Sequence, residues 1–198
     1  MALSYLPTSS AALTQSSLTQ LLDQWQQGDG LAFEKVMQET FRDLQRMAKG
    51  RMYGNEDLTL SPADLLNEAV FRVMENQPDY KNRAHFFATM SLHMRTVLVD
   101  HARARSADKR GAGAVHVTLS HATNAEESMA TELIALDQAL TALEKIDARG
   151  SQVLHLTYFA GLSREEIAEV VGISVPTVDR ELRFTRAWLA ETLGHDLI

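Results

Sequence analysis

The sequence predicts an all-α protein made of two small helical domains joined by a flexible linker, the second domain being a helix-turn-helix. Apolar residues recur every three to four positions along most of the 198 residues, and no strand-like alternation of useful length occurs. Between two periodic halves lies a stretch with Gly111, Gly113 and no sustained periodicity, which indicates a linker. We therefore expect a disordered tail at 1–17, a first domain at 18–106, the linker at 107–130 and the second domain at 131–193.

The first domain is expected to contain several helices, each marked by an apolar stripe and ended by turn or breaker residues. Gly28 and Gly30 interrupt the first stripe, and Gly54 lies in the turn signal after the second. Ser61 is a good N-cap for the next helix, and Pro62 is tolerated in a first helical turn. Helices are expected at 18–27, at 31–44, from Ser61 to before Pro78, and from about Ala84 towards Arg105.

The second domain ends in the strongest local pattern of the chain, which covers residues 163–193. Ser163 and Glu166 have the spacing of a capping box, so a helix begins there, and Gly172 ends it in a short turn. Ser174 then caps a second helix. A helix, a short glycine-containing turn and a second helix are typical of the DNA-binding helix-turn-helix.

The second helix of this motif would present polar residues to DNA. Thr177, Arg180 and Arg183 lie on its outer face, where arginine can contact guanine through two parallel hydrogen bonds. Phe184 and Trp188 lie past the end that would touch DNA, so we expect them in the core. An ordinary pair of packed helices with surface arginines is the alternative interpretation of the same pattern.

Composition excludes several other classes of protein. The chain has no cysteine, so disulfides, thiolate zinc sites and thiol nucleophiles are excluded. The first basic residue is Lys35, and no apolar run approaches the roughly 20 residues that span a bilayer, so we expect a soluble, cytoplasmic protein without membrane contacts. His85, His93 and His101 do not have the three- or four-residue spacing of helical metal ligands, so neither a metal nor a cofactor is expected.

Charge is sorted along the chain, although the formal net charge is −7. The stretch from Glu56 to Asp79 has six acids and one base, whereas the stretch from Lys81 to Arg110 has seven bases and two acids. Such sorting is expected of a protein with one surface for phosphates and another for a basic partner. Unevenly charged, solvated helix faces would give the same pattern.

Two segments of the first domain and the C-terminal pattern together carry a family resemblance. The segment SPADLLNEAVFRVMEN, followed by NRAHFFATMSLHMRTVLVDHARARSADKRG, looks like regions 2.2 to 2.4 of the extracytoplasmic-function (ECF) RNA polymerase sigma factors, and the C-terminal pattern resembles their region 4. The resemblance covers roughly residues 18–193. It implies an alternative sigma factor that has core RNA polymerase and promoter DNA as partners and is not an enzyme.

The resemblance also implies roles for individual residues. The helix that begins near Ser61 would dock on polymerase, the basic helix after it would capture the melted −10 strand, and the helix-turn-helix would bind the −35 element. The expected polymerase-binding residues are Asp64, Asn67 and Glu68. The expected −10 residues are Lys81, Arg83, His85 and Arg95 near the bases and Arg103, Arg105, Lys109 and Arg110 on phosphates. The expected −35 residues are Ser174, Thr177, Arg180 and Arg183.

The docking motif departs from the family pattern, which usually begins Asp-Ala-Glu-Asp. Ser61-Pro62-Ala63-Asp64 keeps one of three acids, so the chain resembles a subgroup without the full acidic motif. A face with less negative charge binds a basic partner more weakly. Phosphorylation of Ser61 or Thr59 by a Ser/Thr kinase would restore about −1.5 to −2 charges at a helix N-terminus. The sequence leaves open whether Ser61 is only an N-cap and whether an anti-sigma factor controls the protein instead.

Two rival functions follow from the same sequence. A conventional helix-turn-helix regulator would bind duplex DNA as a dimer, independently of polymerase, but no obvious dimerisation heptads or ligand pocket accompany the motif. A hydrolase or nuclease would need a nucleophile with an adjacent base, a phosphate loop or a metal cluster, and none is recognisable. A sigma factor is therefore the preferred function.

Overall fold

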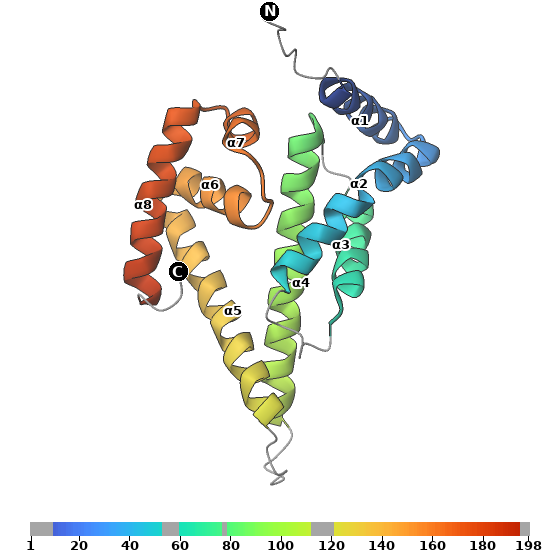
Figure 1. The fold of residues 1–198 in the computed structure, drawn as a ribbon. Coiled ribbons are helices and arrows are strands. Elements are labelled where there is room, and N and C mark those ends of the chain that lie inside the picture. The colour runs from blue at the N-terminus through green and yellow to red at the C-terminus, as the bar shows by residue number, and fades with distance from the viewer. Residues whose placement is uncertain (1–9, 53–59, 77–78, 112–120, 195–198) are drawn as a thin grey trace, which may run out of the picture.

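The computed structural model describes residues 10–52, 60–76, 79–111 and 121–194, which form α-helices joined by short turns (Figure 1). No strand occurs in these ranges, so the predicted all-α class is confirmed. The helices are α1 (Ser10–Gln26), α2 (Gly30–Arg51), α3 (Pro62–Asn76), α4 (Arg83–Gly111), α5 (His121–Ile146), α6 (Ala148–Tyr158), α7 (Arg164–Val171) and α8 (Val175–Leu193). None of them is long and apolar enough to cross a membrane.

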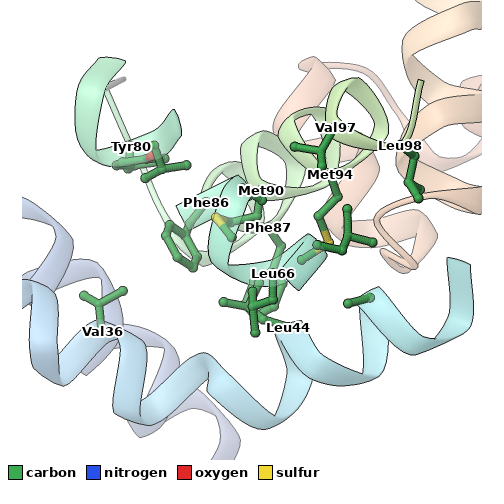
Figure 2. Close-up of a cluster of buried hydrophobic side chains, with 14 of the residues drawn as sticks. Val36, Leu44, Leu66, Tyr80, Phe86, Phe87, Met90, Met94, Val97 and Leu98 are labelled. Atoms are coloured by element: carbon green, nitrogen blue, oxygen red, sulfur yellow. The ribbon is translucent and has the colours of Figure 1, made fainter. Parts of the chain in front are cut away.

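The first half of the chain, α1 to α4, packs around one apolar core. α4 contributes Phe86, Met90 and Met94, which have no exposed surface, and α3 contributes Leu65 and Leu66. Figure 2 shows these α4 side chains gathered with Leu66 in one cluster. Because this stripe of α3 is buried, the opposite face of the same helix is left in solvent.

The second half of the chain, α5 to α8, contains a compact group of three helices. The buried residues that join α6, α7 and α8 are Val153, Ile167, Val178 and Leu182. Gly150 allows α6 to approach α8 closely, since a Cβ at this position would lie 2.8 Å from the Thr185 methyl carbon. These contacts fix the direction in which α8 presents its outer side.

The helix, turn and helix predicted at residues 163–193 are present with the expected local signals. The Ser163 hydroxyl accepts a hydrogen bond from the Glu166 N–H at 3.2 Å, and the Glu166 carboxylate accepts one from the Ser163 N–H at 2.8 Å. Gly172 then adopts a left-handed φ of 73°, which ends α7. Ser174 occupies the N-cap position of α8 with an extended backbone, but its side chain makes no capping hydrogen bond to the helix backbone, contrary to the prediction, because its hydroxyl pairs with that of Thr177.

The two halves of the chain pack against each other. In Figure 1 the long helices α4 (green) and α5 (yellow) lie side by side near the ends that face residues 112–120, and α6 and α7 flank the other end of α4. Ala88 of α4 belongs to the buried cluster of α6, α7 and α8. Leu133 and Leu162 of the second half pack against the core of the first half.

Two of the predicted boundaries are wrong. Helix α1 begins at Ser10, inside the tail predicted at 1–17, and residues 1–9 lie outside the described part. The predicted linker 107–130 is largely helical, because α4 continues to Gly111 and α5 begins at His121. Both stretches lack a sustained apolar stripe but contain strong helix formers, Ala, Leu and Gln in the first and Ala, Glu and Lys in the second, and extending an existing helix costs little. The described chain is therefore two contacting helical halves, rather than two domains held apart by an extended segment.

Candidate functional site

The exposed face of α3 carries the residues that the sequence assigned to polymerase docking. Asp64, Asn67 and Glu68 are exposed, whereas Leu65 and Leu66 on the other side of the helix are buried. The steps of three and four residues place the three polar side chains on one face. The fold therefore brings the predicted set together on a solvated helix surface.

Two large apolar side chains extend this face, and the sequence-based prediction missed them. Phe71 is 66% exposed and Met74 is 49% exposed, and both follow Asn67 at helical spacing. Exposed apolar side chains beside carboxylates are typical of a surface that binds another protein. The signal in the sequence is their spacing from Asn67, four residues for Phe71 and seven for Met74, which places both away from the buried stripe.

Ser61 and Asp64 close the N-terminus of α3 by bonding each other. The Asp64 carboxylate accepts hydrogen bonds from the Ser61 hydroxyl at 2.6 Å and from the Ser61 N–H at 3.1 Å. The Asp64 N–H donates to the Ser61 hydroxyl oxygen at 3.1 Å. The bond from the hydroxyl, and then the one from the N–H, hold the pKa of Asp64 below its usual range. Ser61 is thus an N-cap, as predicted, while Thr59 lies outside the described residues.

Arg72 joins the docking helix to α4. Its guanidinium lies 3.5 Å from Glu68 on its own helix and 3.0 Å from Asp100 on α4. Arg72 is partly buried, whereas both acids are about half exposed. This arrangement fixes the orientation of Glu68 on the exposed face and links the two helices.

At the N-terminal end of α4, the predicted −10 residues Lys81 and Arg83 are held in different ways. Lys81 precedes the helix and is exposed. Arg83 donates to Asp43 of α2 at 2.8 Å, and its guanidinium carbon lies 4.4 Å from the centre of the Phe87 ring. The hydrogen bond from Arg83 is the main cause that lowers the pKa of Asp43. Arg83 is therefore already engaged inside the first half of the chain.

His85 lies near charges from both halves of the chain. Burial, followed by the charge of Lys81, lowers the pKa of His85, while Glu169 of α7 and Asp79 act in the opposite direction. The lowered pKa favours the neutral imidazole near pH 7. A neutral ring can both donate and accept hydrogen bonds, which suits contact with a base edge better than with a phosphate.

Arg95 and Arg103 share a single acid of the second half, Asp137 on α5. Arg95 donates to the Asp137 carboxylate at 2.7 and 3.1 Å, and Arg103 donates to its other oxygen at 2.9 Å. The Arg95 and Asp137 side chains are only 16% and 15% exposed. Two predicted DNA contacts are thus bound to a carboxylate of the chain itself.

The remaining predicted −10 residues lie towards the C-terminal end of α4. Arg105 is half-buried. Lys109 and Arg110 belong to the helix, but their side chains lie outside the described part of the structure. The predicted −10 set is therefore spread along the whole length of α4 rather than gathered at one end.

The outer side of α8 presents the residues predicted for the −35 element. The side chain of Arg180 is 65% exposed, and its guanidinium lies 3.7 Å from the carboxylate of the buried Glu181, while Arg183 is exposed. Glu181 is held by Arg149 of α6 at 2.7 Å. The Ser174 hydroxyl lies 2.9 Å from that of Thr177 in the first turn. The predicted −35 residues therefore lie on a helix whose opposite side is held by contacts with α6.

The expectation that Phe184 lies in the core is wrong. Phe184 is 51% exposed, and it lies one helical turn after Arg180 on the outer side of α8. The buried positions of this helix are instead Leu182, Thr185 and Leu189. Trp188, which was expected in the core, is partly buried against the cluster that contains Leu189. The sequence-based expectation considered distance along the helix and missed the side on which Phe184 falls.

The arrangement combines, in one all-helical fold, a helix-turn-helix with exposed arginines and a separate exposed helix face that carries acidic and apolar side chains. In the described part of the chain, no group of three or more His, Asp or Glu side chains could hold a metal ion. The family model of the ECF sigma factor matches residues 15–195. The chain therefore belongs to the ECF sigma factor family, whose members act in transcription initiation with RNA polymerase and promoter DNA. No curated protein matches the chain.

Proposed function

We propose that this chain is an alternative sigma factor that binds core RNA polymerase through α3 and reads promoters through α4 and α8. The observation that carries the proposal is the combination, in one chain of this family, of an exposed acidic helix face, a basic helix and exposed arginines on a helix-turn-helix. A conventional helix-turn-helix regulator needs neither an acidic face for polymerase nor a basic helix for a melted strand. The combination favours a protein that binds polymerase and DNA together.

Docking on polymerase would use both the charge and the apolar surface of α3. Asp64, Asn67 and Glu68 provide polar and negative groups for a basic partner, which supports encounter and orientation. Phe71 and Met74 provide the apolar area that usually carries most of the binding energy at the centre of an interface. Loss of either apolar side chain should therefore weaken binding more than loss of one rim charge.

Promoter reading would be divided between two helices. On α4 and just before it, the predicted residues at positions 81, 83, 85, 95, 103, 105, 109 and 110 follow a melted −10 strand, where basic groups neutralise phosphates. Phe86 and Phe87 are both buried, so base stacking is not assigned to them. On α8, Arg180 and Arg183 read base edges of the −35 duplex, with Ser174 and Thr177 at the helix start. Phe184, which is exposed on the same side, would contact a thymine methyl group beside them.

Phosphorylation near Ser61 would make polymerase binding by the exposed face of α3 depend on a kinase. Ser61 is exposed at the N-terminus of α3, where the helix dipole favours an anion. A phosphate on Ser61 would remove the hydroxyl proton that is now donated to Asp64 and would set two anions side by side. A phosphate on Thr59 would add the charge and leave the Ser61 cap in place. We therefore favour Thr59 over Ser61 as the acceptor for a Ser/Thr kinase.

The test is co-elution of the purified chain with core RNA polymerase on gel filtration. The unmodified chain is run beside Thr59→Asp, Ser61→Asp and Phe71→Ala, with Leu31→Ala as the matched control because Leu31 on α2 is also 66% exposed. We expect Thr59→Asp to co-elute more strongly than the unmodified chain and Phe71→Ala to reduce co-elution in either background. Leu31→Ala should have no effect.

Two other outcomes would change the proposal. Equal co-elution of the unmodified chain and both Asp variants would remove phosphorylation and leave control to another route, such as an anti-sigma factor. If no variant co-elutes and the chain alone protects a two-fold symmetric duplex site, the protein is a helix-turn-helix regulator that acts without polymerase.

A further inference from the structure

One side of α4, which carries two of the residues proposed to capture the −10 strand (Arg95 and Arg103), is covered by the second half of the chain. Ala88, Ser91 and Arg95 lie on one side of α4, at steps of three and four residues, and each touches α5, α6 or α8. Asn82, just before the helix, and Arg103, near its other end, continue these contacts. These five residues are called the α4 stripe below.

The centre of the α4 stripe is buried against α6. The Ser91 hydroxyl and the His155 ring nitrogen Nε2 lie 2.6 Å apart, and the two residues are 0% and 4% exposed. Ala88 is buried in the same cluster as Val153 and Leu156. A buried polar group costs free energy unless it is paired, so this hydrogen bond favours one relative position of α6 and α4.

The end of the α4 stripe nearer the C-terminus of the helix is held by Asp137. This carboxylate binds the guanidinium of Arg95 through two hydrogen bonds and that of Arg103 through one. Arginine binds carboxylate and phosphate with the same planar pair of donors. Asp137 therefore occupies the donors that a DNA phosphate would use.

The other end of the α4 stripe is held by α7. The Asn82 amide donates to the Glu169 carboxylate at 2.7 Å, and the Glu169 charge also reaches His85. Each helix of the covering surface thus places a polar residue on the α4 stripe: Asp137 from α5, His155 from α6 and Glu169 from α7. These three residues are called the covering face below.

We infer that the covering face is a docking surface whose occupant is the α4 stripe of the same chain, and that it competes with the −10 strand for Arg95 and Arg103. The inference rests on the proposed role of α4 in −10 capture. In the closed arrangement the Arg95 side chain is 16% exposed, and Arg103, although 56% exposed, is bound to Asp137, so neither guanidinium is free for a phosphate. Binding to core polymerase, through the exposed face of α3, can occur before the halves separate, because α3 is not part of the covered surface.

The contact between the halves has the character of an interface that can open. A cleft of about 680 Å³ remains between them, lined by Arg83 and Phe87 from the first half and by Leu162 and Leu193 from the second. Stable cores are close-packed and contain few voids larger than a water molecule. Polar, incompletely packed contacts between parts of one chain usually permit relative movement.

The first experiment locks the closed arrangement. The chain has no cysteine, so Asn82→Cys with Glu169→Cys introduces the only two thiols, in place of two side chains that contact each other across the halves. Mild oxidation should form a disulfide within one chain, seen as faster migration on a non-reducing gel. The control pair Asn82→Cys with Glu144→Cys, which uses an exposed residue of α5, should not form one.

The same double variant then reports on DNA binding. The probe is a fluorescein-labelled single strand of about 16 nucleotides and mixed sequence, followed by anisotropy. We expect the reduced form to bind more tightly than the oxidised form. If the open form makes up about 10% of the reduced protein, removing the closed form tightens binding up to about tenfold. Asp137→Ala should show this gain, whereas Glu144→Ala, which removes the same charge from the same helix, should not.

Different outcomes overturn different parts of the account. If neither a disulfide nor a short bis-maleimide crosslink forms within the chain that carries Asn82→Cys and Glu169→Cys, or if the control pair is linked equally, the closed arrangement is wrong whatever the DNA result. Where only the bis-maleimide links the pair, the crosslinked protein takes the place of the oxidised form in the binding assay. If the disulfide forms but oxidised, reduced and Asp137→Ala proteins all bind the strand equally well, the competition is wrong. If the disulfide forms and none of these proteins binds the strand, α4 does not capture single-stranded DNA, and the proposed −10 role fails while the closed arrangement stands.

Discussion

The two helices proposed to read DNA differ in what their arginines contact. On α4, Arg83, Arg95 and Arg103 are each bound to a carboxylate at 3 Å or less. On α8, Arg180 and Arg183 are exposed to solvent. Composition alone would favour α4 as the DNA-contacting helix, because it has six basic and two acidic residues, whereas α8 has three of each. The difference lies in which acids the fold brings next to them.

If α4 and α8 read DNA as proposed, this difference would keep only one of the two surfaces available in the free protein. Arg180 and Arg183 of α8 are exposed in the form described here, whereas Arg95 and Arg103 of α4 need Asp137 to be displaced first. A duplex −35 element exists before the promoter opens, but a melted −10 strand exists only afterwards. The order in which the surfaces become available therefore matches the order in which their targets appear.

The largest expected effect comes from placing a charge between the halves. Ala88 is 7% exposed and lies in the shared cluster rather than in the core of the first half. Ala88→Arg should cost roughly 3 kcal/mol at the contact, because a large charged side chain enters an apolar site. We expect a larger radius of gyration in small-angle X-ray scattering with unchanged helix content by circular dichroism. A compact variant would show that Ala88 does not hold the halves together.

The next largest effect is expected on α8. Arg180→Ala or Arg183→Ala should each lower discrimination at one base pair of the −35 element by about 1 to 3 kcal/mol. Arg186→Ala is the matched control, since Arg186 lies on the same helix over the ring of Tyr158. Binding of holoenzyme to a library of −35 sequences measures the change. Unaltered base preference in both variants would mean that α8 has been misassigned.

A smaller effect is expected from Phe184, the exposed aromatic residue beside these arginines. Phe184→Ala should lower the preference for thymine at one −35 position by about 1 kcal/mol, because the apolar contact with its methyl group is lost. Replacing that thymine with uracil should produce the same loss in the unaltered protein and no further loss in the variant. Independent losses from the two changes would rule out the contact.

The smallest effect is expected at the N-cap of α3. Ser61→Ala removes the hydroxyl that accepts from the Asp64 N–H and should lower the free energy of unfolding by about 1 kcal/mol. Urea denaturation measures it, and Ser61→Asn is the control because Asn is also a good N-cap. If the two variants unfold at the same urea concentration, the cap contributes nothing, and the exposed hydroxyl has another role.

Local signals in the sequence predicted the helix-turn-helix well. Ser163 with Glu166, and Gly172 nine residues after Ser163, define where α7 begins and ends, and each acts through backbone groups of its own neighbourhood. The apolar stripe of α3 likewise predicted which face stays in solvent. These features depend on residues only a few positions apart, so one sequence is enough to find them.

The contacts between the halves could not be predicted in the same way. Arg95 and Asp137 are 42 positions apart, and Ser91 and His155 are 64 positions apart. No periodicity within either segment reveals which acid a distant arginine meets. The sequence indicates a linker at residues 121–130 for a related reason, because this stretch has no apolar stripe of its own. It is helical as the continuous N-terminal part of α5. The contacts between the halves and the extent of α5 therefore depend on long-range packing, which patterns within one segment do not reveal.

The central claim is that this chain directs polymerase to promoters. The most direct measurement is transcription in vitro by core RNA polymerase on total genomic DNA, with and without the chain or its Thr59→Asp variant, followed by mapping of the RNA 5′ ends. We predict a set of transcription start sites that appears only with the chain. These sites share one pair of −35 and −10 sequences and are lost with Arg180→Ala. Identical start sites with and without the chain would contradict it.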